Sequence, residues 1–332
     1  MNWKGLAVRW TSLAVATFDG PGSPSYGKKS PSYVKRSPSY GQISAACCLS
    51  VLLSSIAMSG LSHAEEPPKL APEVLERCLG ILREGIKSDE FWPAMHAAEA
   101  LTLAGHADEV ISALRDRLPA ERDDQRRCGL ARELARAGDR STLPILLDIL
   151  SDPESTGRVH AAESLFKLGE AGDMKQLRAA FEQTEHPQLQ LWAAAALAKT
   201  GQTDALALVR RQLQSTDGPT RTTVAFALSQ VGGPQDIEPL LKAFASETDT
   251  VPRTFLVNAL ANLGHARGHQ ELIRNLDSAD ATVRTVAAEA AGHARCFDCQ
   301  AKLLQFLDNS TLDTRVRASQ SLLVLSLPAT KR

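Results

Sequence analysis

A repeat unit runs through most of the sequence and constrains its fold more than any other feature. Aligned on six glycines and then on Arg295 and Ser326, the chain repeats at spacings of 33, 31, 32, 31, 32, 31 and 31 residues; the glycines are Gly105, Gly138, Gly169, Gly201, Gly232 and Gly264. Four positions before these landmarks stand Leu101, Leu134, Leu165, Leu197, Leu228, Leu260, Ala291 and Leu322. Seven positions before them stand Ala98, Ala131, Ala162, Ala194, Ala225, Val257, Ala288 and Ser319. This agreement indicates one structural unit, repeated along the chain.

Each unit predicts two short helices. The small residue and the leucine lie on one helical stripe, and the landmark glycine is expected to end this first helix in a left-handed conformation. The second helix is expected at 142–150, 173–181, 204–213, 236–244, 269–276 and 301–307. Such short helices are marginal alone but bury a continuous core when they stack. The pattern therefore predicts an all-α protein, an α-solenoid (superhelix) of about eight helix pairs that we expect to be monomeric.

A column of arginines precedes the landmarks by eleven positions. Six of the eight units have it, at Arg127, Arg158, Arg221, Arg253, Arg284 and Arg315. An arginine in the first turn opposes the helix dipole, so helix propensity does not explain it. We expect these side chains to bond carbonyl groups or the aspartate of an adjacent turn, and so to form a structural ladder along the stack.

The sequence before the repeats predicts targeting rather than folding. Residues 1–42 contain SPSY three times among basic residues and have too little aliphatic surface for a core, which indicates a disordered or mis-started segment. Residues 43–64 have the apolar run and small-residue ending of a signal peptide; because 43–61 are long enough to span a bilayer, a retained membrane anchor is the alternative. We expect 65–91 to be a linker with an N-terminal capping helix, and the solenoid to occupy 92–328. Cleavage would place the protein in the periplasm or outside the cell.

Charge and aromatic content argue against a nucleic-acid partner. Residues 1–64 hold six of the 37 Lys and Arg and one of the 38 Asp and Glu, which leaves residues 65–332 with a net charge of −6. A general nucleic-acid binder normally presents a basic face and aromatic platforms. We therefore expect no nucleic acid, and no membrane contact unless 43–61 remain as an anchor.

The repeats resemble those of a known family. Segments 152–169 and 277–292, with their aspartate, arginine, paired alanines and closing leucine or glycine, are similar to HEAT repeats, specifically the short phycobilisome-lyase-type HEAT-like repeats. The resemblance covers about residues 92–326, and it implies a curved scaffold that binds other proteins. The family name also implies two alternatives: a lyase-type enzyme related to bilin lyases, or an accessory subunit of a separately encoded enzyme.

Candidate catalytic groups are sparse in the sequence. Glu99, Glu163 and Glu289 recur six positions before the landmarks, and His96 and His160 recur at nine. Carboxylates spaced one per repeat are too far apart for paired acid–base chemistry, so we expect these residues on a solvated face. We accordingly expect no catalytic residues and no cofactor.

One local cluster contains cysteines. Cys296 and Cys299 follow His293, while His265 and His269 occupy the corresponding turn of the preceding unit. After export, a disulfide between the two cysteines, free thiols and a zinc site are all open; a bound metal is not our expectation.

A row of basic residues on the second helices suggests where a partner docks. Arg211, Lys242 and Arg274 share one register in consecutive units, with Arg178 and Arg210 nearby. If the second helices line the inner surface of the solenoid, this row would attract an acidic protein segment or an anionic ligand. Simple complementation of the helix dipoles is the alternative.

Overall fold

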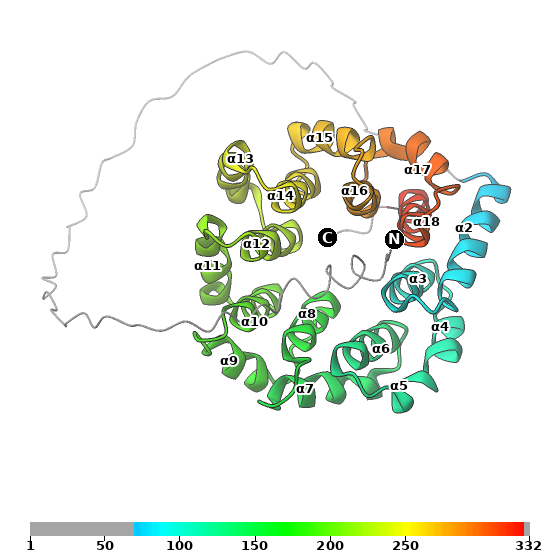
Figure 1. The fold of residues 1–332 in the computed structure, drawn as a ribbon. Helices are drawn as coiled ribbons and strands as arrows, with labels where there is room; N and C mark the ends of the chain where they lie inside the picture. The colour runs from blue at the N-terminus through cyan, green and yellow to red at the C-terminus, as the bar shows by residue number, and fades with distance from the viewer. Residues whose placement is uncertain (1–69, 329–332) are drawn as a thin grey trace, which may run out of the picture. The chain divides into compact units, whose positions relative to one another are not determined.

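The computed structural model describes residues 70–328, and this part of the chain contains helices and no strand. The predicted α-solenoid is confirmed: the helices alternate between two layers (Figure 1). The inner layer comprises α3 (Phe91–Leu103), α6 (Asp124–Arg136), α8 (Arg158–Leu168), α10 (Pro187–Lys199), α12 (Gly218–Val231), α14 (Thr250–Asn262), α16 (Ala281–His293) and α18 (Leu312–Ser326). The predicted leader segments, 1–42 and 43–64, lie outside the described residues.

The outer layer contains the shorter helices. It comprises α2 (Pro72–Gly85), α4 (Ala107–Leu114), α5 (Arg117–Ala120), α7 (Leu143–Ser151), α9 (Lys175–Phe181), α11 (Thr203–Arg211), α13 (Ile237–Ser246), α15 (Ala266–Leu276) and α17 (Gln300–Phe306). Their apolar residues pack on the inner helices around the leucines that precede the landmarks, and Leu101, Leu165 and Leu228 are at most 1% exposed. Burial of such a leucine contributes about 1.5–3 kcal/mol, so the core runs continuously between the layers.

Glycine ends most of the inner helices as predicted. Five of the landmark glycines have positive φ angles, among them Gly105 at 89° and Gly201 at 90°. Gly232 differs: its φ is −72°, because the chain continues through a second glycine into a short 3-10 turn. Arg295 replaces glycine in the seventh unit and still adopts a φ of 50°. The turn geometry of the repeat therefore persists where its usual residue is missing.

The stack curves the other way from our expectation. We expected the second helices to line the inner surface, but Figure 1 places α7, α9, α11, α13, α15 and α17 on the outside. The physical reason is the small residue at the seventh position before each landmark. Ala98, Ala162 and Ala225 are fully buried in the inner helices, and side chains this small allow neighbouring helices to approach closely. The layer with the closer spacing takes the inside of the curve.

The curvature brings the two ends of the described solenoid together. The last helix, α18, packs against α2 and α3 as well as against α16 and α17 (Figure 1). Most of α18 is consequently buried, including Arg317, Ser319 and Gln320. An end helix of an open solenoid normally has a polar outer face, whereas here the helices of residues 70–328 close into a ring. We call the contact of α18 with α2 and α3 the seam.

Candidate functional site on the inner helices

The inward faces of the inner helices form one surface. Residues two and six positions before each landmark lie two residues after and two residues before the buried leucine. Because a helix turns about 100° per residue, both project about 200° away from that leucine, on the opposite side of the helix. With the residues nine positions before the landmark they form a stripe that the outer helices do not cover. We call these stripes together the inner surface. Its central column consists of Glu99, Arg132, Glu163, Ala195, Phe226, Asn258, Glu289 and Gln320.

A network of ion pairs crosses the seam on this surface. Arg317 of α18 lies 3.1 Å from Glu99 of α3 and 3.1 Å from Glu289 of α16. Glu99 also lies 3.2 Å from Arg136 of α6, which pairs with Glu133 in its own helix. The Arg317 side chain is only 6% exposed. Four inner helices that are adjacent in the ring are thus linked through buried charges.

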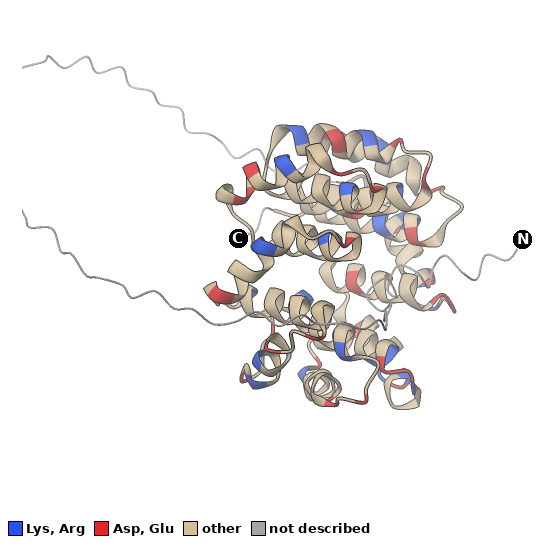
Figure 2. Cartoon of the chain, turned by 60° about the vertical axis from the view of Figure 1, so that its left-hand side comes forward, with Lys and Arg blue, Asp and Glu red and all other residues tan. Residues whose placement is uncertain are grey.

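A second set of charges flanks this network. His96 of α3 lies 2.6 Å from Asp313 of α18, which adds another contact across the seam. On α8, Glu163 pairs with Lys167 at 2.7 Å and lies 3.5 Å from His160. Figure 2 shows basic and acidic segments interspersed over the helices rather than separated into two faces. On the inner surface, Glu99, Glu163, Glu289 and Asp313 each lie within 3.1 Å of a basic side chain.

Neighbouring cations control the ionisation of these carboxylates. Burial by itself raises the pKa of Glu99, but the guanidinium groups of Arg136 and Arg317 outweigh it and hold the pKa well below its usual range. Lys167 has the same effect on Glu163, and His96 lowers the pKa of Asp313. These three carboxylates therefore remain ionised at neutral pH and pair with the cations.

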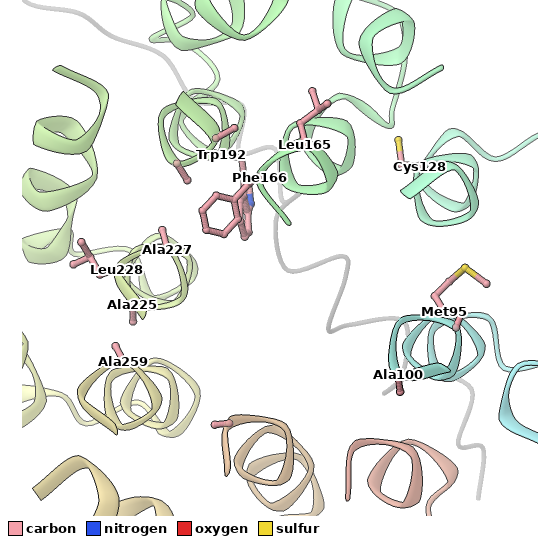
Figure 3. Close-up of a cluster of buried hydrophobic side chains, with 14 of the residues drawn as sticks. Met95, Ala100, Cys128, Leu165, Phe166, Trp192, Ala225, Ala227, Leu228 and Ala259 are labelled. Atoms are coloured by element: carbon pink, nitrogen blue, oxygen red, sulfur yellow. The ribbon is translucent and has the colours of Figure 1, made fainter. Parts of the chain in front are cut away.

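Aromatic side chains continue the inner surface away from the seam. Phe166 and Trp192 lie beside each other between α8, α10 and α12 (Figure 3), with ring centroids 5.8 Å apart. Phe226 contacts both of them and also Phe255, in edge-to-face arrangements at 5.9–6.1 Å. Phe166 is fully buried and Trp192 is 7% exposed, so Phe226 and Phe255, which are partly exposed, are the rings that this half of the surface presents.

Three polar side chains of the inner surface are buried without a hydrogen-bond partner for one of their atoms. Within the described part of the chain, no partner exists for Nε2 of His160, Oδ1 of Asn258 or Nε2 of Gln320. These residues are 4%, 7% and 2% exposed. An unsatisfied buried polar group costs about 1–3 kcal/mol, so each of these atoms gains free energy when a water molecule or a ligand group pairs with it.

The basic row identified in the sequence lies on the outer helices, and most of its members are paired. Arg178 pairs with Asp204, Arg210 with Asp236, and Arg274 with Glu271; the distances are 2.5, 2.7 and 2.8 Å. Arg211 and Lys242 are exposed. The row therefore does not face the inside of the ring, and carboxylates of the same chain already balance much of its charge.

The arginine column bonds the turns that precede the inner helices. Arg284 donates to the carbonyls of Ser278 and Ala279, and Arg315 donates to Asn309 and Ser310 in the same way. Arg253 donates to the carbonyls of Phe244 and Glu247, and Arg158 to the carbonyl of Leu150. Arg221 donates to the carbonyls of Ser215 and Thr216 and also to the carboxylates of Glu247 and Asp249. Arg127 instead pairs with Asp124 in its own helix. The bonds to backbone oxygens satisfy carbonyls at or just after the ends of the outer helices.

The cysteine cluster contains a disulfide that closes a short turn. Cys296 and Cys299 are joined by a disulfide between α16 and α17. Their sulfurs are thus not thiolate ligands for zinc, and residues 70–328 hold no group of three or more His, Cys, Asp or Glu side chains arranged for a metal ion. Among the helices of this same stretch, none has the length and apolarity needed to cross a membrane.

The main error of the sequence reasoning concerns the inner carboxylates. We expected Glu99, Glu163 and Glu289 on a solvated face, but their side chains are only 17–24% exposed and are paired with cations. The face opposite the leucine stripe would be solvated in a straight stack, whereas a closed ring turns it inward. A signal was present in the column itself, since Phe226, Asn258 and Gln320 occupy the same register as the three glutamates.

Comparison with known proteins supports the repeat assignment. Residues 174–261 match the family model of HEAT repeats, which confirms the resemblance found in the sequence. Human deoxyhypusine hydroxylase in complex with glycerol is 19% identical, with a TM-score of 0.38 over 76% of this chain and 97% of that chain. The complex of CpcE and CpcF of phycocyanin lyase from a Nostoc species is 22% identical, with a TM-score of 0.31 over 78% of this chain and 96% of that chain. An engineered protein is 18% identical, with a TM-score of 0.23 over 77% of this chain and 97% of that chain. No curated protein matches the sequence.

Proposed function

We propose that this HEAT-repeat protein is an exported, non-catalytic binding ring, which holds a segment of another protein against its inner surface. The observation that carries the proposal is the set of unsatisfied polar atoms on His160, Asn258 and Gln320. They lie on three different inner helices, α8, α14 and α18, and all three are more than nine-tenths buried. A polypeptide supplies both donors and acceptors along its length, so one bound segment can satisfy groups that are spread around the ring.

The outer surface offers less to a partner. Its arginines are largely paired within the chain, as Arg178, Arg210 and Arg274 show. The pair of Arg274 is exposed and contributes little to stability, while Arg210 is held by the carboxylate of Asp236, whose side chain is 4% exposed. The inner surface instead combines buried charges with aromatic rings, and aromatic and arginine side chains dominate the energy of many protein interfaces.

The proposed location outside the cytoplasm is inferred from the leader sequence. Residues 43–64 have the order of a signal peptide, and the disulfide between Cys296 and Cys299 suits an oxidising compartment. The rival functions, a lyase-type enzyme and an accessory subunit, rest on the family resemblance alone.

The test uses a pair of variants of the full-length protein. His160→Phe with Asn258→Leu removes two unsatisfied polar groups, while the phenylalanine can still stack on Trp92, whose ring lies 5.8 Å from His160. Removing an unsatisfied polar atom also removes its desolvation penalty, and Glu163, which lies 3.5 Å from His160, keeps Lys167 as its partner. The matched outer variant is Arg211→Gln, Lys242→Gln and Arg274→Gln.

The two variants separate the inner from the outer surface. Each is immobilised and exposed to native envelope extract, and the captured proteins are quantified by mass spectrometry. The inner variant should melt no lower than the parent and lose at least about tenfold of its specific partner, while the outer variant should keep it. Loss of capture by the outer variant alone would show that the basic row is the docking site and that the proposal is wrong.

A further inference from the structure

A small pocket opens on the inner surface between α12, α14 and α16. Phe226 and Phe255 contribute its aromatic walls, and its polar lining comes from Ser229, Asn258, Asn262, Glu289 and His293. We call it the inner pocket. Its volume is about 20 Å³, which is far below the several hundred Å³ of a cofactor site. The inner pocket thus has room for the tip of a side chain and not for a whole metabolite.

The oxygen atoms of the pocket favour a hydrogen-bond donor. Oδ1 of Asn258 is buried with no hydrogen-bond partner in residues 70–328, and the residue is 7% exposed. Glu289 lies 3.1 Å from Arg317, and the same guanidinium group also pairs with Glu99. Because a carboxylate has about four acceptor sites, Glu289 retains capacity for a second donor.

The aromatic walls favour a donor that is positively charged. The face of a phenylalanine ring carries negative electrostatic potential and attracts cations within about 6 Å. Phe226 already has such a contact, since Nζ of Lys167 lies 5.6 Å from its ring centroid. Lys167 is itself held by Glu163 at 2.7 Å, so its charge is balanced outside the pocket.

We propose that the inner pocket binds a lysine or arginine side chain of the partner protein. This inference rests on the proposed function and adds the chemistry of one contact. A cationic head can donate to Asn258 and Glu289 together while its alkyl stem and charge lie against Phe226. Charge-assisted hydrogen bonds are roughly twice as strong as neutral ones, so the pocket should distinguish a cation from a neutral group of the same shape.

The experiment uses two pairs of small probes and the full-length protein. N-acetyl-arginine amide is compared with the citrulline compound, its neutral isostere, and N-acetyl-lysine amide with its side-chain acetylated form. Binding is followed by NMR through the side-chain amide resonance of Asn258, which is assigned by its loss in Asn258→Leu. At least one cationic probe should bind about tenfold or more tightly than its neutral counterpart.

Two variants examine the role of the carboxylate. Glu289→Gln should weaken the cationic probe by about fivefold or more and leave the neutral probe unchanged, because it removes charge with little change in shape. The matched control is Glu271→Gln, which removes the outer carboxylate that pairs with Arg274 and should have no effect.

Two results would overturn the inference. Equal binding of neutral and cationic probes would show that the pocket does not select charge, and an unperturbed Asn258 resonance would show that the probes bind elsewhere. Neither result affects the capture experiment, so the proposed function could still hold. Conversely, selective probe binding together with undiminished capture by the inner variant would defeat the proposed function alone.

Discussion

Replacing Arg317 by methionine should loosen the seam and leave the rest of the ring intact. Methionine keeps most of the aliphatic stem but removes the guanidinium group, which pairs with Glu99 and Glu289 and donates to Gln320 at 2.8 Å. Breaking a buried ion pair from one side typically costs 3–5 kcal/mol. We expect about 3 kcal/mol, at the low end of that range, because Arg136 still compensates the charge of Glu99.

Two free cysteines provide an internal measurement of this loosening. Cys78 of α2 is buried and lies beside Ser319 of α18, and burial raises the pKa of its thiol to about 11. Cys128 of α6 is equally buried, and its sulfur lies 3.7 Å from the carbonyl oxygen of Gly157 beside α8, on the side of α6 opposite to the seam. Alkylation of a buried thiol under native conditions reports the population of the open state. A change of about 3 kcal/mol corresponds to roughly a 100-fold increase in labelling of Cys78.

Mass spectrometry of the labelled peptides gives the alkylation rates of Cys78 and Cys128 separately. Cys78 should react faster in Arg317→Met, and Cys128 should keep its parent rate. Arg274→Met is the control, because Arg274 is 70% exposed and its pair with Glu271 should contribute no more than about 0.5 kcal/mol. The reasoning is refuted if Cys78 labelling stays unchanged, or if both cysteines accelerate together, which would indicate global unfolding.

Three further predictions concern the turns, the inner carboxylates and the leader. Gly201→Ala should lower the free energy of unfolding in urea by about 1–2 kcal/mol. The cause is backbone strain alone, since the φ of Gly201 is 90° and nothing lies within 4 Å of the added methyl group. The control is Gly80→Ala inside α2, where the space is equally open and the change should be neutral or stabilising. Cations hold the pKa values of Glu99 and Glu163 below the ordinary range, so the stability that these two ionised carboxylates contribute is present above about pH 4.5 and should be lost as the pH falls further. An unfolding midpoint, followed by circular dichroism, that is independent of pH between 5 and 2 would contradict this. Mass spectrometry of the exported protein should find a mature N-terminus at Glu65, and a chain that keeps its apolar segment in the membrane fraction would show an anchor instead.

The sequence predicts the repeated unit well because its signals are local. Helix starts, glycine turns and the leucine stripe depend on residues that lie within one unit of one another. The fully buried Ala98 and Leu101 and the left-handed Gly105 illustrate this, since three to seven residues separate them. Such spacings are set by the geometry of a single helix, whatever the rest of the chain does.

The ring and its inner surface depend on quantities that no local pattern contains. Closure results from a small rotation per unit that accumulates over the whole stack. The contacts that close it join residues more than 200 positions apart, such as His96 with Asp313 and Glu99 with Arg317. A modest error in the rotation per unit would leave these pairs far from each other. The alanines of the inner helices indicate the direction of the curvature, but they do not predict where it ends.

Site-specific photo-cross-linking in the native envelope tests the binding ring most directly. A benzophenone amino acid is placed at Phe226 on the inner surface and, in a second strain, at Lys242 on the outer helix α13. The binding ring predicts one reproducible cross-linked protein from position 226, through a segment that carries a lysine or arginine, and none from position 242. A partner that cross-links at position 242 and never at position 226 would contradict it.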